Sequence, residues 1–577
     1  MSTDRRIVEC VPNFSEGRNM DVIQQITSEI EKVKGVKLLD VDPGEATNRT
    51  VVTFVGEPEA VVEAAFQGVK KAAQLIDMRQ HHGAHPRMGA TDVLPLIPVS
   101  GITLEECAEL ARNLAERMAT ELSIPCYCYE AAAFTPERKN LAVCRAGEYE
   151  ALQKKLTTEG KQPDFMPKEM VEGTIPEAVL RSGCTAVGAR DFLIAVNYNL
   201  NTTSTRRANA IAFDVREKGR PMREGGKLTG KILTYEDGSP IMQPGTLKCT
   251  KAIGWYIEEY GIAQVSMNMT NLQVTPLHVA FDEVCRCAQN RGIRVTGTEI
   301  VGLVPKKTLI DAGRYFLEKQ HRSTGIPEED IIKIAIKSMG LDDLKPFNPR
   351  EKVIEYMLED AEKDSPQTSH LLPLTVKAFA EETSRESPAP GGGTISAYMG
   401  ALAAALGTMV ANLSSHKAGW DDRWNEFSQW ADKGQNLMNE LLLLVEEDTE
   451  AFNRIMAAFS MPKTTDAEKA VRKAAIQEAT LYATLVPLHT MQASFKAFEI
   501  CKAMALDGNP NSVSDAGVGA LAARAAVLGA GMNVKINASS LTDREKAEAL
   551  IAEANAIIAE ANAAETKITE IVEEKIK

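Results

Sequence analysis

Three histidines, His81, His82 and His85, stand within five residues of one another in the motif HHGAHPRMG, residues 81–89. The glycines and the proline of this motif indicate irregular backbone, and Pro86 restrains the conformation of the residue before it. An imidazole gains and loses a proton near neutral pH, so a histidine held in such a loop is a candidate general acid and base. The alternative is a polar surface loop without a chemical role.

A second candidate is an acid inside an apolar helical pattern. Apolar residues follow the helical period on one face around Asp448; they are Leu441, Leu444, Val445, Phe452, Ile455 and Phe459. Burial of an ionised carboxylate is costly, so the pKa of Asp448 should rise, and its protonated form would be a general acid. The alternative is a surface acid at the edge of the stripe, beside Glu446, Glu447 and Glu450.

Two polar loops in the same C-terminal region suit a ligand with carbonyl or carboxylate groups. APGGG, residues 389–393, precedes a run of small residues and could present backbone N–H groups at a helix N-terminus. NPNSVSD, residues 509–515, is equally explained by turn chemistry and by capping of the helix after it. A flexible turn also explains the glycine triplet. For both loops, a ligand-binding role and a purely structural role therefore remain alternatives.

The composition limits the class of protein. A chain of 577 residues is too long for a single hydrophobic core, and its length favours about three or four domains. A hydrophobic content of 44% and a charged content of 25% are ordinary for a globular protein. The net charge of -14 argues against nucleic acid as a partner.

The cysteines and the apolar stretches indicate a cytoplasmic protein. The ten cysteines are scattered, and the pairs Cys126/Cys128 and Cys285/Cys287 lack the two-residue spacer of zinc knuckles, so we expect free thiols and no metal. The N-terminus shows no signal-peptide pattern. The uncharged residues 388–416 contain too few large aliphatic side chains for a membrane helix, so no membrane partner is expected.

The elements that must position these groups begin with an α/β pattern. Strands are expected at residues 8–11, 37–42, 50–56, 93–99 and 124–129, and helices at about 21–33, 58–75 and 104–121. The order β-α-β-β-α-β predicts a ferredoxin-like split βαβ unit with a further helix and strand.

A second, similar α/β unit is expected farther along the chain. Its strands are predicted at residues 192–200, 262–269 and 300–304, and its helices at 205–218 and 276–291. Residues 219–250 are predicted to form an exposed hairpin or loop. The two units could face each other across a cleft, a common place for ligands.

From residue 369 onward the pattern is helical and predicts an all-α helical bundle. Residues 163–181 and 361–369 are linker-like, and the last helix is expected to open with a capping box formed by Thr542 and Glu545. The chain is therefore divided into two α/β domains at residues 1–191 and 192–358, a linker at 359–368 and a helical domain at 369–577.

Longer motifs occur in order along nearly the whole chain. The first part contains ECVPNFSEGRN (9–19), LLDVD (38–42), TNRTVVTFVG (47–56), HHGAHPRMGATDV (81–93), RAGEYEAL (145–152) and GARDFLIAVNYNL (188–200). Farther on stand IGWY (253–256), IVGLVP (300–305), SPAPGGG (387–393), VEEDTEAF (445–452) and the pair Ser514–Asp515. With these motifs the chain resembles the formimidoyltransferase-cyclodeaminase (formiminotransferase cyclodeaminase) family in its fused, bifunctional form.

The resemblance implies two consecutive reactions on one folate in histidine degradation. The first moves the formimino group of N-formimino-L-glutamate to N5 of tetrahydrofolate and releases glutamate. The second closes the ring to 5,10-methenyltetrahydrofolate and expels ammonia. Tetrahydrofolate, with or without a polyglutamate tail, is thus expected as a co-substrate, and the two α/β domains are expected to form the transferase.

The resemblance also implies roles for particular residues. The histidine of the H-P-R triplet, His85, corresponds to the proton carrier of the transferase, and Asp448 corresponds to the acid of the cyclodeaminase. His81 and His82 are expected to orient His85 or to bind the amidine. Asp92 is a candidate to hold an imidazole in a productive tautomer.

Folate binding is expected in the segment from Met166 and Pro167 to Gly183, which follows the PDF triplet. This segment is longer than the family pattern, and residues 168–180 are hard to align. Basic residues near the cleft would bind the carboxylates of the substrates, although each could instead form a structural ion pair. The candidates are Arg87, Arg145 and Arg190.

Three other functions remain open from the sequence. A glutamate formyltransferase acting with 5-formyltetrahydrofolate would need the same first domains. A metal-dependent hydrolase would use His81, His82 and His85 as ligands. The third is a helical domain that serves only oligomerisation. On oligomeric state, the resemblance implies a homo-oligomer built from dimers, and the family includes octamers.

Overall fold

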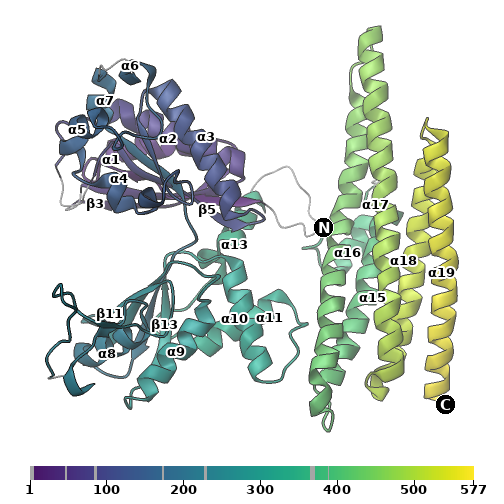
Figure 1. Ribbon diagram of the computed structural model, residues 1–577. Coiled ribbons are helices and arrows are strands. Elements are labelled where there is room, and N and C mark those ends of the chain that lie inside the picture. Colours follow the sequence, from purple (N-terminus) through teal and green to yellow (C-terminus); the bar gives the residue numbers. More distant parts are fainter. Residues whose placement is uncertain are drawn as a thin grey trace. The chain divides into compact units, whose positions relative to one another are not determined.

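The computed structural model describes residues 6–45, 48–82, 87–171, 175–226, 230–363, 371–386 and 389–577. The chain forms two compact units, one of Met1–Leu309 with Met339–Ser365 and the other of Ile310–Ser338 with Pro366–Lys577. The first contains two larger sheets and the second is helical (Figure 1). The expected multidomain architecture, α/β followed by helical, is confirmed at this level.

The first sheet is mixed and has seven strands. They are β1 (Ile7–Cys10), β2 (Asn13–Phe14), β3 (Val36–Gly44), β4 (Arg49–Gly56), β5 (Thr91–Ser100), β6 (Cys126–Glu130) and β7 (Thr185–Ala189). β1 and β2 both pair with β4 and β5, and β3 pairs with β4 on its other side. β7 and then β6 extend the sheet beyond β5 with parallel pairing.

Two layers of helices cover this sheet. The long helices α1 (Met20–Glu31), α2 (Pro58–Leu75) and α3 (Leu104–Leu122) share one apolar core with it. The short helices α4 (Leu141–Arg145), α5 (Leu152–Thr157), α6 (Lys168–Val171) and α7 (Glu177–Ser182) contribute to the other. Cys126 and Cys128 belong to the first core, while Tyr127 and Tyr129 belong to the second, as strand alternation requires.

The second sheet has four antiparallel strands in the order β11-β12-β8-β13. Its strands and helices are β8 (Ile194–Leu200), α8 (Thr205–Val215), β11 (Thr250–Ile257), β12 (Ile262–Met269), α9 (Leu277–Gln289) and β13 (Val295–Val301). A two-stranded sheet, β9 (Arg220–Pro221) with β10 (Met242–Gln243), lies within the predicted loop. The segments after β13 are α10 (Lys306–Lys319), α11 (Glu328–Met339), α12 (Pro349–Lys352) and α13 (Ile354–Lys363).

The helical unit is built mainly from five long helices. Its elements after residue 375 are α14 (Val376–Thr383), α15 (Gly392–Ser415), α16 (Trp424–Ser460), α17 (Asp466–Asp507), α18 (Val513–Ser539) and α19 (Arg544–Ile576). Small residues let α15 approach α17, because a Cβ at Gly400 would lie 2.3 Å from Ser494 Oγ and one at Gly407 would lie 2.8 Å from Ile500 Cγ2.

Two helical segments of the described chain, Gly392–Ser415 and Pro510–Ser539, are long and apolar enough to cross a membrane by length and composition. In their most apolar windows, 61% and 50% of the residues are buried inside the structure. Core helices of a bundle have the same composition, so these helices alone are weak evidence for a membrane.

Several expectations from the sequence were wrong in detail. Residues 163–171 and 175–181 are no linker, because Phe165 pairs with the edge strand β6, and Met170 and Val179 are buried in the second core of the first sheet. The last strand of the second sheet starts at Val295 rather than at residue 300, and β11 was not predicted. The last helix is capped by Asp543, whose carboxylate accepts from Lys546 N, because the hydroxyl of Thr542 is bonded to Gln477.

The segment Ile310–Ser338 packs with the helical unit, although the sequence-based division assigns it to the second α/β domain. The loop after α10 enters the bundle, since a Cβ at Gly325 would lie 2.2 Å from the backbone carbon of Ala431. Thr324 donates to Asp432 at 2.5 Å. The sequence-based domain boundaries otherwise stay predictions.

Two candidate active sites

The motif with three histidines connects α2 to β5. His85 lies outside the described residues, and the nearest described residues are His82 before it and Arg87 after it. His81 is 7% exposed, and its Nε2 lies 2.8 Å from the backbone oxygen of Asn48. A carbonyl oxygen only accepts, so Nε2 of His81 carries the hydrogen and Nδ1 carries the lone pair. Burial lowers the pKa of His81, with a smaller contribution from Arg87.

Every N–H group of the Arg87 guanidinium has an internal partner. Nε donates to His81 Nδ1 at 3.4 Å, Nη2 donates to the backbone oxygen of His81 at 3.2 Å, and both Nη atoms reach Glu150 at 2.7 and 2.8 Å. Nη1 also donates to Glu148 at 3.1 Å. These bonds, led by the one to Glu150, raise the pKa of Arg87, so it stays charged. A guanidinium with five internal bonds is better suited to holding the loop than to binding a substrate.

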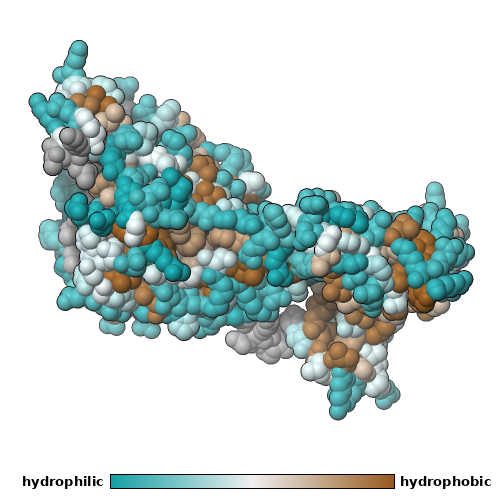
Figure 2. Space-filling model, turned by 90° about the horizontal axis from the view of Figure 1, so that it is seen from below, coloured by the Kyte–Doolittle hydropathy of each residue, from teal (hydrophilic) through white to brown (hydrophobic). Residues whose placement is uncertain are grey.

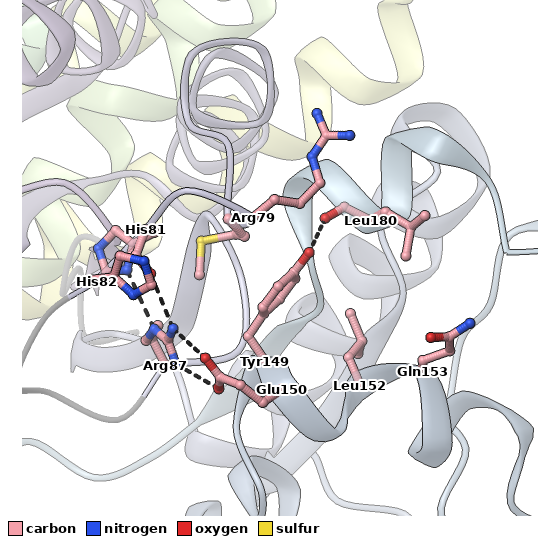
Figure 3. Close-up of a pocket in the computed structure, with 10 residues that line it drawn as sticks. Arg79, His81, His82, Arg87, Tyr149, Glu150, Leu152, Gln153 and Leu180 are labelled. Carbon is pink, nitrogen blue, oxygen red and sulfur yellow. Dashed lines mark hydrogen bonds and ion pairs between the residues drawn. The ribbon is translucent and has the colours of Figure 1, made fainter.

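A cavity of about 300 Å³ opens beside these residues. It is lined by Met78, Arg79, His81, His82, Arg87, Tyr149, Glu150, Leu152, Gln153 and Leu180. His81, His82, Arg87 and Glu150 meet at one end, and Gln153 lies at the other (Figure 3). His82 is exposed, whereas His81 and Arg87 are buried, so His82 is the imidazole of this pair that a ligand in the cavity could contact.

The predicted folate segment reaches the histidine motif at its end. Gly183 and Gly89 form an isolated backbone bridge, and a Cβ at Gly183 would lie 2.3 Å from the backbone oxygen of Met88. Gly183 also has a φ of +69°, which favours glycine. Met166 is half-buried against the second core of the first sheet, and Pro167 is buried; neither lines the cavity.

The other charged candidates lie apart from the cavity. Asp92 is fully buried, accepts from Met88 N at 2.9 Å and pairs with Arg145 at 2.6 Å. Its described partners are thus a backbone N–H and an arginine rather than an imidazole. Arg190 donates to the backbone oxygen of Asp191 at 3.2 Å and lies near the buried Glu9, whose pKa burial raises to about 7.

Sequence reasoning missed the carboxylates and the amide of this site. Glu148 and Glu150 stand in the motif RAGEYEAL, but nothing in a single sequence pairs them with an arginine 61 and 63 residues earlier. Asn48 was also missed as a site residue, although it stands in the motif TNRTVVTFVG, residues 47–56. A charged pair of carboxylates two residues apart was the one available signal.

The second candidate site surrounds Asp448 on α16. Thr394, at the start of α15, is fully buried and donates through Oγ1 to Asp448 Oδ2 at 2.8 Å. The same hydroxyl accepts from Gly391 N at 3.3 Å. Burial raises the pKa of Asp448, and the hydrogen bonds from Thr394 oppose the rise. The expected direction of the shift is confirmed: burial favours the protonated form of Asp448 relative to that of an exposed aspartate.

The glycine triplet makes room for this carboxyl group. A Cβ at Gly393 would lie 2.1 Å from Asp448 Oδ1, whereas one at Gly392 would meet nothing nearer than Asn533 Nδ2 at 3.5 Å. The backbone of α15 can therefore approach Asp448 only because residue 393 lacks a side chain. The loop is thus explained by a close approach to an acid rather than by a flexible turn.

The neighbouring acids have other partners. Glu446 accepts from the backbone of Leu371 at 2.7 Å, and Glu447 accepts from the hydroxyl of Tyr482 at 2.8 Å. Asp448 is half-buried, whereas the predicted stripe reaches the surface at Phe459, which is 50% exposed. Asp448 is therefore the acid of this cluster whose side chain meets the start of α15.

The Asn509–Asp515 loop lies at the other end of α15. Asn509 N donates to Ser414 Oγ at 2.8 Å, while Asp448 meets Thr394, twenty residues earlier on the same helix. Twenty helical residues span ~30 Å, so Ser514–Asp515 and Asp448 are not parts of one site within a single chain. Among the residues that the structure describes, no group of three or more His, Cys, Asp or Glu side chains could hold a metal ion.

The chain thus has two candidate sites on two different folds. One is a cavity lined by His81, His82 and Arg87 in the α/β unit, and the other is a half-buried carboxyl group with a raised pKa in the helical unit. Comparisons with protein families give each part a match. Residues 7–190 match the N-terminal subdomain of the formiminotransferase domain, residues 195–359 match the formiminotransferase domain, and residues 375–556 match formiminotransferase-cyclodeaminase.

Individual proteins support the same division. The formimidoyltransferase-cyclodeaminase of Rattus norvegicus is 41% identical over 93% of this chain and 93% of its own length. The glutamate formimidoyltransferase of Streptococcus pyogenes is 42% identical over 54% of this chain and 94% of its own length. The methenyltetrahydrofolate cyclohydrolase of Methylorubrum extorquens is 38% identical over 35% of this chain and 97% of its own length. The chain belongs to the formimidoyltransferase-cyclodeaminase family.

Proposed function

We propose that the chain transfers the formimino group of N-formimino-L-glutamate to tetrahydrofolate and then cyclodeaminates the product to 5,10-methenyltetrahydrofolate and ammonia. The observation that supports this proposal is that each of the two candidate sites lies in a part of the chain that matches one half of the family. Together the two reactions convert tetrahydrofolate, the co-substrate, to 5,10-methenyltetrahydrofolate within histidine degradation.

In the transferase reaction, N5 of tetrahydrofolate attacks the formimino carbon, and the bond from that carbon to the glutamate nitrogen breaks. N5 must lose a proton and the leaving nitrogen must gain one, so one imidazole can serve both steps. We assign this role to His85. His81 is less suited to it, because its Nε2 is committed to Asn48, its Nδ1 faces Arg87 and its pKa is lowered by burial.

The remaining residues of the first site receive binding or holding roles. His82, exposed at the cavity, is proposed to contact the formimino group or a carboxylate of the glutamate part of the substrate, while His81 and Arg87 hold the loop. For the folate we propose the segment that contains Met166, Pro167 and Gly183, because Gly183 adjoins the histidine motif. Arg190, which does not line the cavity, is proposed to contact a carboxylate of the substrate.

In the cyclodeaminase reaction, N10 of the folate attacks the same carbon and the bond to the terminal nitrogen breaks. Ammonia leaves far more easily than amide ion, so this nitrogen must be protonated first. Asp448 is the proposed donor. Its protonated form is favoured by burial, and Thr394 fixes one of its oxygens.

We further propose that both α/β domains are ferredoxin-like. The order β11-β12-β8-β13 with helices between β8 and β11 and between β12 and β13 supports this for the second. In the first, β3, β4, β1 and β5 follow the same order, with β7 and β6 added.

A cytoplasmic homo-oligomer is proposed as the working form. Apolar side chains reach the surface of the helical unit (Figure 2). On α15 and α18 they include Leu402, Met409, Leu413, Val518, Leu521, Met532 and Ile536. A second copy covering this surface would remove it from water, and light scattering that gives a monomer would contradict the assembly.

The function is tested by separating the two activities in one chain. His85→Ala should lower formimino transfer by about 10²–10⁴-fold, because general acid–base catalysis contributes about that much, and should spare cyclisation of supplied 5-formiminotetrahydrofolate. Asp448→Asn should do the reverse, so that the intermediate accumulates and ammonia is not released. Formyl and formimino donors compared in the same assay separate this function from a formyltransferase.

Equal loss of both activities in either variant would contradict two independent sites. Preference for the formyl donor would overturn the transferase assignment. If Asp448→Asn leaves ammonia release intact, the alternative that the helical unit serves only oligomerisation would be favoured.

A further inference from the structure

Asn48 joins three separate segments at the transferase site. Its Oδ1 accepts from Gly17 N at 3.0 Å, its Nδ2 donates to the backbone oxygen of His82 at 3.0 Å, and its own backbone oxygen bonds to His81 Nε2 at 2.8 Å. The residue is 8% exposed and has a φ of +48°. One bond goes to the loop before α1 and two go to the histidine motif, so this position connects the start of β4 to both segments.

These bonds continue into the arginine on the other side of the motif. The Asn48 carbonyl fixes the hydrogen on Nε2 of His81, which leaves Nδ1 free to accept from Arg87 Nε. Arg87 in turn binds Glu150 with both Nη atoms. One continuous set of bonds therefore holds residues 81 and 82 before the proposed proton carrier and residue 87 after it.

We propose that Asn48 is a positioning residue of the formimino transferase, acting through the backbone of His82 and the ring of His81 to hold the ends of the segment that carries His85. This inference rests on the proposed function of His85. A positioned acid–base group must lie within hydrogen-bond reach of the proton that it moves. A displacement of about 1 Å can cost about 10²-fold in rate.

The residue type fits this role. Asparagine offers one acceptor and one donor on the same short side chain and adopts positive φ more readily than most residues. An ionised aspartate would keep the acceptor for Gly17 but would face the carbonyl of His82 without a hydrogen to donate. A glycine would keep the backbone conformation and the bond to His81 but would lose both side-chain bonds.

The experiment uses the full chain with Asn48→Asp and Asn48→Gly, and with Asn140→Asp as the control. Asn140 is an exposed helix cap whose Oδ1 accepts from Ala142 N at 3.0 Å, a role that aspartate also fills. Both Asn48 variants should lower kcat for formimino transfer by about tenfold or more, with KM changed by less than about threefold. Cyclodeamination of supplied 5-formiminotetrahydrofolate, measured on the same molecules, should stay within about twofold, as should both activities of the control.

Other results overturn the inference. A rise in KM with kcat unchanged would make Asn48 a binding residue, and unchanged kinetics in both variants would remove its role. Parallel loss of both activities in both variants would mean that Asn48 holds the fold rather than the site. If His85→Ala leaves transfer intact, the proposed function fails; if His85→Ala abolishes transfer and the Asn48 variants do not lower it, this inference fails alone.

Discussion

The two candidate sites control their ionisable groups in opposite ways. At the transferase site, Arg87 is held by Glu148 and Glu150, so the charged groups compensate one another. At the candidate cyclodeaminase site, Asp448 accepts a hydrogen bond from the hydroxyl of Thr394. No cation pairs with this carboxylate within the part of the chain that the structure describes. The first site thus pairs its charges, whereas at the second burial raises the pKa of an acid that has no paired cation among the described residues.

This difference predicts that the two sites are sensitive to different kinds of substitution. A network of charge-assisted hydrogen bonds depends on the shape of its donors, because a guanidinium presents them in a fixed fork. A carboxylic acid held against a helix depends instead on the space around it, because a few atoms decide its position and its desolvation. Substitutions that change only volume should therefore damage the helical site most, and substitutions that change only donor geometry should damage the α/β site.

The largest effect is expected from Gly393→Ala. The new methyl group would lie 2.1 Å from Asp448 Oδ1, so the carboxyl group or α15 must move. A displacement of about 1 Å can lower a rate by about 10²-fold, and we expect that loss for cyclodeamination of supplied 5-formiminotetrahydrofolate. Formimino transfer, measured on the same preparation, should be unchanged.

The adjacent glycine supplies the matched control. A Cβ at Gly392 would come no nearer than 3.5 Å to Asn533 Nδ2, so Gly392→Ala should keep cyclodeamination within about twofold of the unsubstituted chain. Similar losses in both variants would mean that helix α15 tolerates no side chain here for reasons unrelated to Asp448, and the comparison of the two sites would lose its basis.

A smaller effect is expected from Arg87→Lys. Lysine keeps the charge but cannot donate at once to His81 and to both oxygens of Glu150. Hydrogen bonds to charged groups contribute about 1.5–3 kcal/mol each, and lysine retains part of them, so the free energy of unfolding should fall by about 2 kcal/mol. Formimino transfer should fall by about tenfold, and cyclodeamination should not change.

Arg286→Lys is the control for this substitution. Arg286 also forms a fork to a carboxylate, with Nε and Nη2 donating to Glu283 at 2.8 and 2.7 Å, but 55% of its side chain is exposed. Exposed ion pairs contribute about 0–1 kcal/mol, so thermal unfolding should change little. Equal destabilisation by the two substitutions would contradict the special role of the buried fork.

The sequence predicted more of the helical site than of the α/β site. The apolar period around Asp448 is local, and helical spacing alone was enough to single out an acid in a buried stripe. Helix α2 was also predicted with the bounds Pro58–Leu75 that the structure shows, since proline opens it and its apolar period is regular.

The contacts that could not be predicted join distant parts of the chain. Thr394 meets Asp448 across 54 residues, and Arg87 meets Glu150 across 63. No periodicity connects such pairs, because tertiary packing decides them. The short strands β2 and β7 were missed for a related reason: β2 has two residues and β7 is small and glycine-containing, so neither shows a strand pattern without its neighbours.

The smallest effect is expected from Thr394→Val. This substitution removes the hydroxyl that donates to Asp448 and nearly preserves the shape of the side chain at position 394. That hydroxyl stabilises the ionised carboxylate and lowers its pKa, so its loss should raise the pKa of Asp448 further. Because the protonated acid is the active form, the alkaline fall in cyclodeamination should move to higher pH, with about a twofold change at neutral pH. Rate profiles of Thr394→Val and Thr394→Ser on supplied intermediate measure this, and the serine variant should match the unsubstituted chain.

The pH dependence of the free energy of unfolding should shift in the same direction as the rate profile. An acid whose pKa is higher in the folded chain than the value of about 4 in the unfolded chain binds its proton more tightly when folded. Its contribution to stability is therefore fully present below the unfolded pKa and is lost as the pH rises through the folded pKa. Thr394→Val should extend that window upward, so the unfolding free energy of the variant should keep falling at pH values where that of the serine variant has levelled off. A window that moves downward would mean that Thr394 acts on Asp448 through packing rather than through its hydroxyl.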